Sequence, residues 1–291
     1  MSLTSNTSDR TIAVVIVTYN SDGVLGMCLE SLRRQTRPAD LVVIVDNNST
    51  QPDYLDEVPT SAPFKLLRNI RNEGFCGGNN TGYALARTCD YVLFLNPDAL
   101  VTNRFMEDAL QWMERPEHAR VGCLTGTLLG FDVAAARPTG LIDSTGIFQK
   151  WYGKWYDRRQ GTPWETPPPG SAIEDLPAAC GALMFCRTAA LEEVARNTEE
   201  VFDKRFFMYK EDIDLSLRLR ARGWRIVYWP DLLCYHGRGW QGRGKMSYRA
   251  RYWSARNELR LCWRNHLKGL PYSLLKFTYV ATLERLRHWA G

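Results

Sequence analysis

The sequence has no long apolar run and no recognisable leader. No stretch of 18 or more residues is apolar throughout, and the longest candidate, residues 270–283, is interrupted by Pro271 and Lys276. A membrane-spanning helix is therefore not expected. The first ten residues lack a basic start followed by an apolar core, so they do not resemble a signal peptide. We expect them to be flexible and the ordered chain to begin near Thr11.

Metal-binding cysteine pairs are also missing. The chain has eight cysteines in 291 residues but no C-x-x-C pair, which disfavours a zinc site. In a protein that is not exported, these thiols should stay reduced. We expect them to be small core residues. Cys180 and Cys186 are separated by apolar residues, which suits a buried strand.

The composition excludes disorder and coiled coil, because 45% hydrophobic and 24% charged residues are ordinary globular values. The charge is nevertheless uneven. Residues 243–291 contain 11 Lys and Arg against two acidic residues, together with eight aromatics, so the rest of the chain is mildly acidic although the net charge is +5. We therefore predict a flexible start at 1–10, a globular body at 11–242 and a basic, aromatic helical tail at 243–291.

Buried strands alternate with helical patterns along the body. Strands are predicted at 11–17, 41–45, 64–67, 91–95, 178–187 and 224–228. Helices are predicted from a cap at Asn20 or Ser21 to about 35, over 77–87, from the acidic cluster at 211–214 to about 222, and from 248 onward. Residues 131–177 are predicted to form an aromatic-rich hairpin followed by a loop at 161–171. The alternation indicates right-handed βαβ units and an α/β fold with a mostly parallel sheet.

Polar clusters follow three of the predicted strands, beginning at Thr18, Asp46 and Asn96. Because ligands bind beyond the carboxyl ends of parallel strands, three clusters on one edge indicate a site. Asp98, after a strand and a proline, can bind Mg²⁺ or Mn²⁺, although N-P-D is also a common turn. His236, after a later strand, is a second candidate ligand, although a lone histidine is more often structural.

Two further segments carry candidate chemistry. The glycine-rich loop at 72–80 opens a helix, where backbone N–H groups can approach a phosphate or a ribose, although it fits no standard phosphate-binding motif. Glu211, Asp212 and Asp214 stand at a predicted helix start beside aromatic residues, which would raise a carboxyl pKa and suit a general base. The alternative is that they only stabilise the helix dipole.

The order and spacing of these motifs resemble family-2 glycosyltransferases of the GT-A fold, and most of all the bacterial rhamnosyltransferase-like branch. The resemblance covers roughly residues 11–240. The matching segments are V-T-Y-N (17–20), V-D-N-N-S (45–49), N-E-G-F-C-G-G-N-N (72–80), L-N-P-D (95–98), G-A-L-M (181–184), F-F-M-Y-K-E-D-I-D-L-S-L-R (206–218), G-W (223–224) and Y-H (235–236).

The resemblance implies a role for each matching position. Contacts to the nucleotide-sugar donor are implied for Thr18, Asn20, Asp46, Asn72, Gly74, Asn79, Asn96 and Asp98. Asn96 stands where the family's D-x-D motif has its first Asp, and Asp98 and His236 would hold Mg²⁺ or Mn²⁺. Asp212 matches the residue that deprotonates the acceptor hydroxyl, whereas Glu211 and Asp214 match the motif but are weaker candidates for the base.

The expected function is metal-dependent, inverting sugar transfer to a hydroxyl of a cell-surface glycan or lipid-linked saccharide, with dTDP-L-rhamnose as the best guess for the donor. Transfer of a hexosyl or galactofuranosyl group from a UDP-sugar, or non-catalytic binding of nucleotide sugars, remain alternatives. A Rossmann oxidoreductase is disfavoured because residues 18–23 lack the glycine fingerprint.

We expect a cytoplasmic protein. The tail either packs on the body or binds an anionic membrane surface peripherally, since basic charge beside aromatics suits such a surface. Nucleic acid is not an expected partner, because the body is acidic and carries no common nucleic-acid motif.

Overall fold

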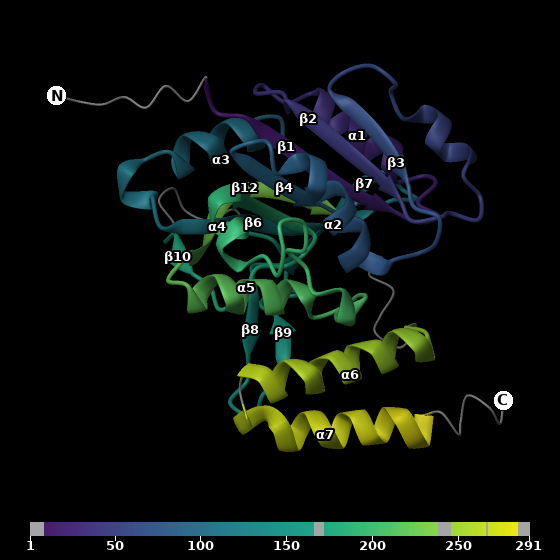
Figure 1. Cartoon of the computed structure of the whole chain (residues 1–291), viewed down its shortest axis with the longest axis vertical. Coiled ribbons are helices and arrows are strands. Elements are labelled where there is room, and N and C mark those ends of the chain that lie inside the picture. The colour runs from purple at the N-terminus through teal and green to yellow at the C-terminus, as the bar shows by residue number, and fades with distance from the viewer. Residues whose placement is uncertain (1–8, 166–171, 238–245, 266, 285–291) are drawn as a thin grey trace.

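The computed structural model describes residues 9–165, 172–237, 246–265 and 267–284 (Figure 1). The strands are β1 Ile12–Thr18, β2 Leu41–Asp46, β3 Phe64–Arg68, β4 Tyr91–Leu95, β5 Ala99–Val101, β6 Val121–Asp132, β7 Arg137–Ser144, β8 Ile147–Gln149, β9 Trp155–Asp157, β10 Glu174–Asp175, β11 Leu183–Arg187 and β12 Arg225–His236. The α-helices are α1 Leu25–Arg33, α2 Gly74–Ala86, α3 Phe105–Met113, α4 Thr188–Val194, α5 Glu211–Ala221, α6 Tyr248–Asn265 and α7 Leu270–Tyr279.

The N-terminal half has the predicted parallel arrangement. Strands β3, β2, β1 and β4 are parallel neighbours, and Thr18 at the end of β1 stands opposite Asp46 at the end of β2. Helix α2 lies against β1 and β2, and its glycines permit the close approach. A Cβ on Gly82 would meet Val15 at 2.4 Å, and one on Gly78 would meet Val17 at 2.5 Å.

The second half makes the sheet mixed rather than mostly parallel. Strand β11 runs antiparallel to both β4 and β6, while β12 runs parallel to β6 and pairs with the short β5. Strand β6, which lies between β11 and β12, was not predicted from the sequence. Its threonines and glycines interrupt the apolar pattern that marks a buried strand.

Helix α1 begins later than predicted. Its N-terminal cap is Val24, without a side-chain hydrogen bond, rather than Asn20 or Ser21. Asn20 has φ of 50° and its Oδ1 accepts a hydrogen bond from the Thr50 amide at 2.8 Å. Asn20 is thus hydrogen-bonded to the loop after β2 and does not cap α1. Helix α1 begins with backbone hydrogen bonds only.

The aromatic excursion contains the predicted hairpin, formed by β8 and β9. It reaches down from the sheet towards the C-terminal helices (Figure 1). There the Trp155 amide donates to the fully buried Glu258 carboxylate at 3.3 Å, and Gly153 packs against the backbone of Gly269. Residues 166–171 of the predicted loop lie outside the described residues. All eight cysteines are buried and free, as expected.

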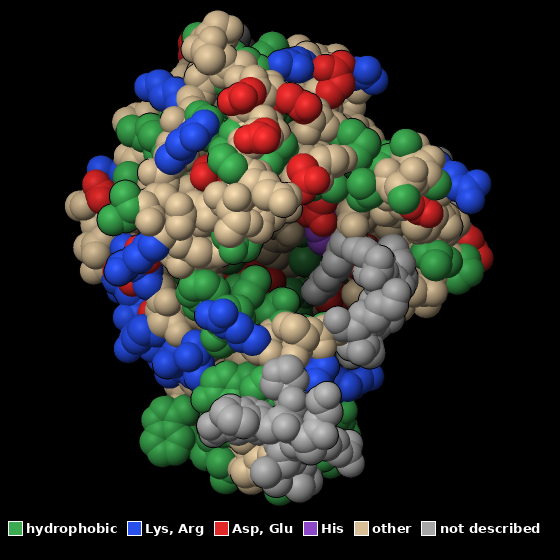
Figure 2. Space-filling view, turned by 90° about the vertical axis from the view of Figure 1, so that its right-hand side faces the viewer, with side chains coloured by type: hydrophobic (Ala, Val, Ile, Leu, Met, Phe, Trp, Pro, Cys, Tyr) green, Lys and Arg blue, Asp and Glu red, His purple; other side chains and the backbone are tan. Residues whose placement is uncertain are grey.

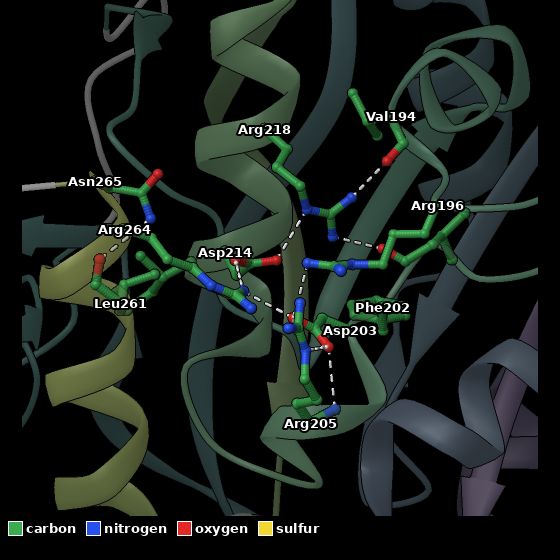
Figure 3. Close-up of polar contacts among 12 residues, drawn as sticks. Val194, Arg196, Phe202, Asp203, Arg205, Asp214, Arg218, Leu261, Arg264 and Asn265 are labelled. Carbon is green, nitrogen blue, oxygen red and sulfur yellow. Dashed lines mark hydrogen bonds and ion pairs between the residues drawn. The ribbon is translucent and has the colours of Figure 1, made fainter.

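The C-terminal helices are joined to the body by a cluster of arginines and aspartates, shown in Figure 3. Arg264 of α6 contacts Asp203 at 2.7 Å and Asp214 of α5 at 3.4 Å. Asp203 is 1% exposed in its side chain and also pairs with Arg196 and Arg205, each at 2.9 Å. The predicted boundary at residue 242 falls within 238–245, which lie outside the described residues, and stays a prediction.

Asp203→Asn should lower the free energy of unfolding at pH 7 by about 3–5 kcal/mol, the typical cost of breaking a buried ion pair. Burial alone would raise the pKa of Asp203, but hydrogen bonds from Arg205 and Arg264 outweigh it and hold that pKa well below its ordinary value. A carboxyl with a lowered folded-state pKa stabilises the protein above its unfolded pKa of about 3.9, and this stabilisation is lost as the pH falls.

Urea unfolding between pH 7 and pH 3 therefore should show a steeper loss of stability in the wild type than in Asp203→Asn. The matched control is Asp175→Asn, because Asp175 pairs with Arg225 at 2.8 Å on the exposed surface. That change should cost no more than about 1 kcal/mol. Equal effects of the two substitutions would contradict a structural role for the Asp203 cluster.

Candidate active site

The ends of β4, β5 and β12 bring Asp98 and His236 together. Asp98 follows β4, and β5 pairs with β12 so that Ala99 stands opposite His236. Asp98 Oδ1 lies 3.3 Å from His236 Nε2, and Asn96 Nδ2 lies 3.4 Å from the same nitrogen. Asn96, Asp98 and His236, which come from segments about 140 positions apart, are thus in contact at one edge of the sheet.

Asp143 of β7 orients the histidine and was missed by the sequence analysis. Its Oδ2 lies 2.7 Å from His236 Nδ1, and both side chains are buried. A carboxylate on one ring nitrogen fixes the ring and directs the other nitrogen towards a ligand, here towards Asp98. Burial alone would lower the pKa of His236, but the neighbouring Asp98 and Asp143 raise it to about 9. No local sequence pattern around Asp143 predicts its hydrogen bond to His236.

The Asp98–His236 pair fits a divalent ion that is also held by a ligand. Within the described residues, no three His, Cys, Asp or Glu side chains are grouped so that they could hold a metal ion. Mg²⁺ and Mn²⁺ commonly take one or two protein ligands and complete their shell with phosphate oxygens and water. The Asp98 carboxylate is a ligand of the kind these ions prefer, and the oriented imidazole of His236 on the same pocket would supply a second nitrogen ligand.

The polar residues after β1 and β2 form a second group. Asp46 accepts hydrogen bonds from the Ser49 hydroxyl at 2.6 Å and the Ser49 amide at 3.1 Å. The Tyr54 hydroxyl lies 2.8 Å from both the Ser49 hydroxyl and that of Thr18, whose side chain is fully buried. Asn20 is exposed. The predicted residues Thr18, Asn20 and Asp46 therefore lie at one edge of the sheet, and their donor contacts stay predictions.

The glycine-rich loop packs against the segment before the acidic cluster. Asn72 Oδ1 accepts from the Gly74 amide at 2.8 Å, and Gly74 has φ of 70°. A Cβ on Gly74 would stand 2.5 Å from the Phe207 carbonyl oxygen, so only glycine fits there. Asn79 is buried and its Nδ2 donates to the Phe75 carbonyl at 2.9 Å. The donor contacts expected of these residues stay predictions.

Asp212 lies on the pocket that also contains Asp98 and His236. This pocket has a volume of about 240 Å³ and is lined in addition by Asn96 and Lys210. Asp212 accepts hydrogen bonds from the Gly181 amide at 3.0 Å and the Ile213 amide at 2.8 Å. Burial nevertheless raises the pKa of Asp212. This direction agrees with the expectation of a raised carboxyl pKa in this cluster, with burial as the cause.

The other two carboxylates of the cluster have different environments. Asp214 is bound by Arg218 at 2.8 Å and Arg264 at 3.4 Å, so it belongs to the structural cluster of Figure 3. Glu211 lines the pocket, is buried, and its Oε2 has no hydrogen-bond partner. Burial and the neighbouring Asp212 raise the pKa of Glu211 well above its ordinary value. Burial therefore favours the protonated form of Glu211 over the charged form.

The small pocket carries the candidate chemistry although a larger one exists. An open groove of about 900 Å³ lies between α1, β5 and β12, but it contains none of the predicted site residues. In Figure 2 a hollow lies between the upper body and the lower helices, and a histidine and acidic side chains are visible in it. The convergence of carboxylates and an oriented histidine identifies the smaller pocket as the candidate active site.

Residues 13–193 match the sequence family described as "Glycosyl transferase family 2". The chain is 28% identical over 250 residues to the pre-mycofactocin glycosyltransferase of Mycobacterium tuberculosis, covering 85% of this chain but only 47% of that protein. It is 27% identical over 249 residues to the N-acetylglucosaminyl-diphospho-decaprenol L-rhamnosyltransferase of the same species, covering 77% of this chain and 75% of the relative.

Two solved structures have the same fold. The crystal structure of GalNAc-T7 with UDP, GalNAc and Mn²⁺ superimposes with a TM-score of 0.66 at 18% identity, covering 88% of this chain and 50% of that one. The mannosyltransferase PcManGT of Pyrobaculum calidifontis with GDP-Man and Mn²⁺ superimposes with a TM-score of 0.58 at 17% identity, covering 97% and 76%. These matches show the GT-A fold that the sequence motifs predicted.

Proposed function

The chain belongs to glycosyltransferase family 2, and on that premise we propose that it transfers a sugar from a nucleoside-diphosphate sugar to an acceptor hydroxyl with inversion. The observation that carries this proposal is the shared pocket of Asp98, His236 and Asp212. It supplies a place for the diphosphate and a base for the hydroxyl. A protein that only binds nucleotide sugars would have no need of a carboxylate with a raised pKa beside that place.

At the donor end, Asp98 and His236 would hold Mg²⁺ or Mn²⁺. When bound, the ion offsets the negative charge that grows on the departing diphosphate. Asp143 keeps the His236 ring fixed through the hydrogen bond at Nδ1. The polar edge at Thr18, Asn20 and Asp46, together with Asn72, Gly74 and Asn79 at the start of α2, would contact the nucleoside and the sugar.

At the acceptor end, Asp212 would take the proton from the attacking hydroxyl. The new bond forms between that oxygen and the anomeric carbon as the bond to the diphosphate oxygen breaks, so a single displacement inverts the anomeric centre. The raised pKa of Asp212 makes its carboxylate a stronger base than an exposed aspartate. The raised pKa of the neighbouring Glu211 disfavours a second negative charge beside Asp212.

We propose dTDP-L-rhamnose as the donor and a saccharide or lipid-linked saccharide of a cell-surface glycan as the acceptor. The supporting observation is the 27% identity to a protein named as an L-rhamnosyltransferase acting on a diphospho-decaprenol. A UDP-sugar with hexosyl or galactofuranosyl transfer is the alternative, since a neighbouring structure contains UDP. The proposed location is the cytoplasm, peripherally on the inner face of the membrane.

We further propose that α7 provides the membrane contact. Helix α6 packs on the body, but Leu274, Leu275 and Tyr279 of α7 are 52%, 73% and 43% exposed and share one face by their spacing. Figure 2 shows Lys and Arg side chains gathered above exposed hydrophobic side chains on the lower helices. This combination suits an anionic lipid surface. None of the described helices is long and apolar enough to cross a membrane.

Asp98→Asn should keep the fold and remove Mn²⁺-dependent binding of dTDP and UDP, because a neutral amide is a poor ligand for a hard cation. In the wild type, Mn²⁺ affinity should rise between pH 7 and pH 9, since His236 with a pKa of about 9 must lose a proton before it can bind metal. Isothermal calorimetry measures both effects. Asp175→Asn, on the exposed strand β10, is the control, and unchanged Mn²⁺ dependence in Asp98→Asn would remove the metal assignment.

Asp212→Asn should lower kcat by about 10²–10⁴-fold while nucleotide binding survives, because shape is kept and basicity is lost. Glu211→Gln is the matched comparison, because Glu211 lines the same pocket beside Asp212 and the substitution keeps its size, and it should change kcat only a few-fold. Release of nucleoside diphosphate from the active donor measures the rate. Normal turnover in Asp212→Asn together with an inactive Glu211→Gln would assign the base to Glu211 instead.

The full chain should float with anionic vesicles at low salt and detach at high salt, because the Debye length falls from ~10 Å at 0.1 M to ~3 Å at 1 M. Leu275→Glu should weaken this flotation. Ile70→Glu is its control, because Ile70 is 94% exposed on the loop before α2, away from α7. If the wild type stays soluble beside anionic vesicles at low salt, the tail is only a packing element.

A further inference from the structure

The segment that leads into Asp212 has an unusual backbone. Phe207, Tyr209 and Lys210 have φ of 64°, 70° and 73°, although none is glycine. Phe207 has ψ of −64° and the Met208 amide donates to the Phe206 carbonyl at 2.7 Å, which makes a γ-turn of the rare kind. Such conformations persist only where the surrounding structure enforces them, and they gather at functional sites.

One side chain of helix α6 holds this turn. Asn257 is fully buried, and its Nδ2 donates to the carbonyl oxygens of Phe206, Met208 and Tyr209 at 2.7, 2.8 and 3.0 Å. The remaining carbonyl of the run, that of Phe207, accepts from the Cys76 amide of α2 at 3.1 Å. Four successive carbonyl groups are thereby fixed, three of them by one residue from the C-terminal part of the chain.

Side-chain packing holds the same turn from both sides. The Phe207 ring lies 4.6 Å from the Trp253 ring of α6, centroid to centroid. On its other side the Phe207 carbonyl touches Gly74 so closely that no Cβ would fit there. The turn is therefore clamped between the start of α2 and the middle of α6, and it continues directly through Lys210 into Glu211 and Asp212 at the start of α5.

We propose that Asn257 is a positioning residue for the glycosyl transfer site. It enforces the strained turn over residues 206–210 and thereby sets where Lys210 and Asp212 stand in the pocket. This inference rests on the proposed function, since Asp212 is taken as the base. It also makes α6 a working part of the site, although α6 contributes no residue to the lining of the pocket that contains Asp212.

The first test needs no substrate. In Asn257→Ala, hydrogen–deuterium exchange of peptides covering residues 203–214 should become at least about tenfold faster, while peptides from β1 and β4 stay unchanged. Asn265→Ala is the matched control, because its exposed amide donates to Leu261 within α6 at 3.2 Å and touches no part of the turn. Unchanged exchange at 203–214 in Asn257→Ala would overturn the proposal whatever the protein's activity.

The second test separates positioning from stability. Asn257→Ala should lower kcat by about 10- to 100-fold with donor KM within about twofold, because misplacement of about 1 Å can cost 10²-fold in rate. Arg264→Ala removes the ion pairs with the aspartates and the contact with the Phe206 ring but leaves the Asn257 hydrogen bonds to the turn, so it should lower stability and keep kcat. Equal kcat for the wild type and Asn257→Ala overturns the positioning role.

Asn257→Leu, which is of similar size and has neither donors nor charge, replaces the alanine variant if that does not fold, with the same expected results. The proposed sugar transfer and the proposed positioning role of Asn257 can be disproved independently. If the wild type transfers no sugar from dTDP-, UDP- or GDP-sugars, the proposed function fails, whereas the exchange measurement still decides the clamp. If the wild type is active and Asn257→Leu retains its kcat and its slow exchange, only the positioning role of Asn257 fails.

Discussion

Parallel pairing of β1 with β2 and β4 is the constraint on which the site depends. It places the polar residues that begin at Thr18, Asp46 and Asn96, at the ends of these strands, along one edge of the sheet. Without this pairing, these polar residues would lie in three separate segments that are far apart in the sequence and could not form one site. Strand β12 then adds His236 to the same edge by pairing with β5. The backbone ladder, rather than any side-chain contact, brings together the residues of the proposed donor site.

Asp212, the proposed base, is positioned by a different set of contacts. Asp212 stands at the start of α5 after a turn with three non-glycine residues at positive φ. Helix α6 stabilises this turn through Asn257 and Trp253, and Arg264 ties the same helix to Asp203 and Asp214. Helix α6 is therefore packed against the segment that carries Asp212, whereas α7 leaves Leu274, Leu275 and Tyr279 exposed.

Motifs with local signals could be predicted from the sequence, and long-range partners could not. Apolar runs gave β1, β2 and β4 within one or two residues, and the ends of those runs located Asp46 and Asp98. Asp143 and Asn257 were missed because their roles depend on residues more than 45 positions away. Strand β6 was missed because its glycines and threonines break the apolar pattern. The mixed sheet escaped prediction because strand order is set by long-range pairing, not by local periodicity.

Ligand-dependent stabilisation tests the central claim most directly. Thermal unfolding would be followed with a panel of dTDP-, UDP- and GDP-sugars, each with Mn²⁺ and with a chelator. A donor at ~100 times its Kd should add about 2.7 kcal/mol of stability. The account predicts that one nucleotide class raises the melting temperature by several degrees and does so only with the metal present. A panel in which no nucleotide sugar raises it, with or without Mn²⁺, would contradict the account.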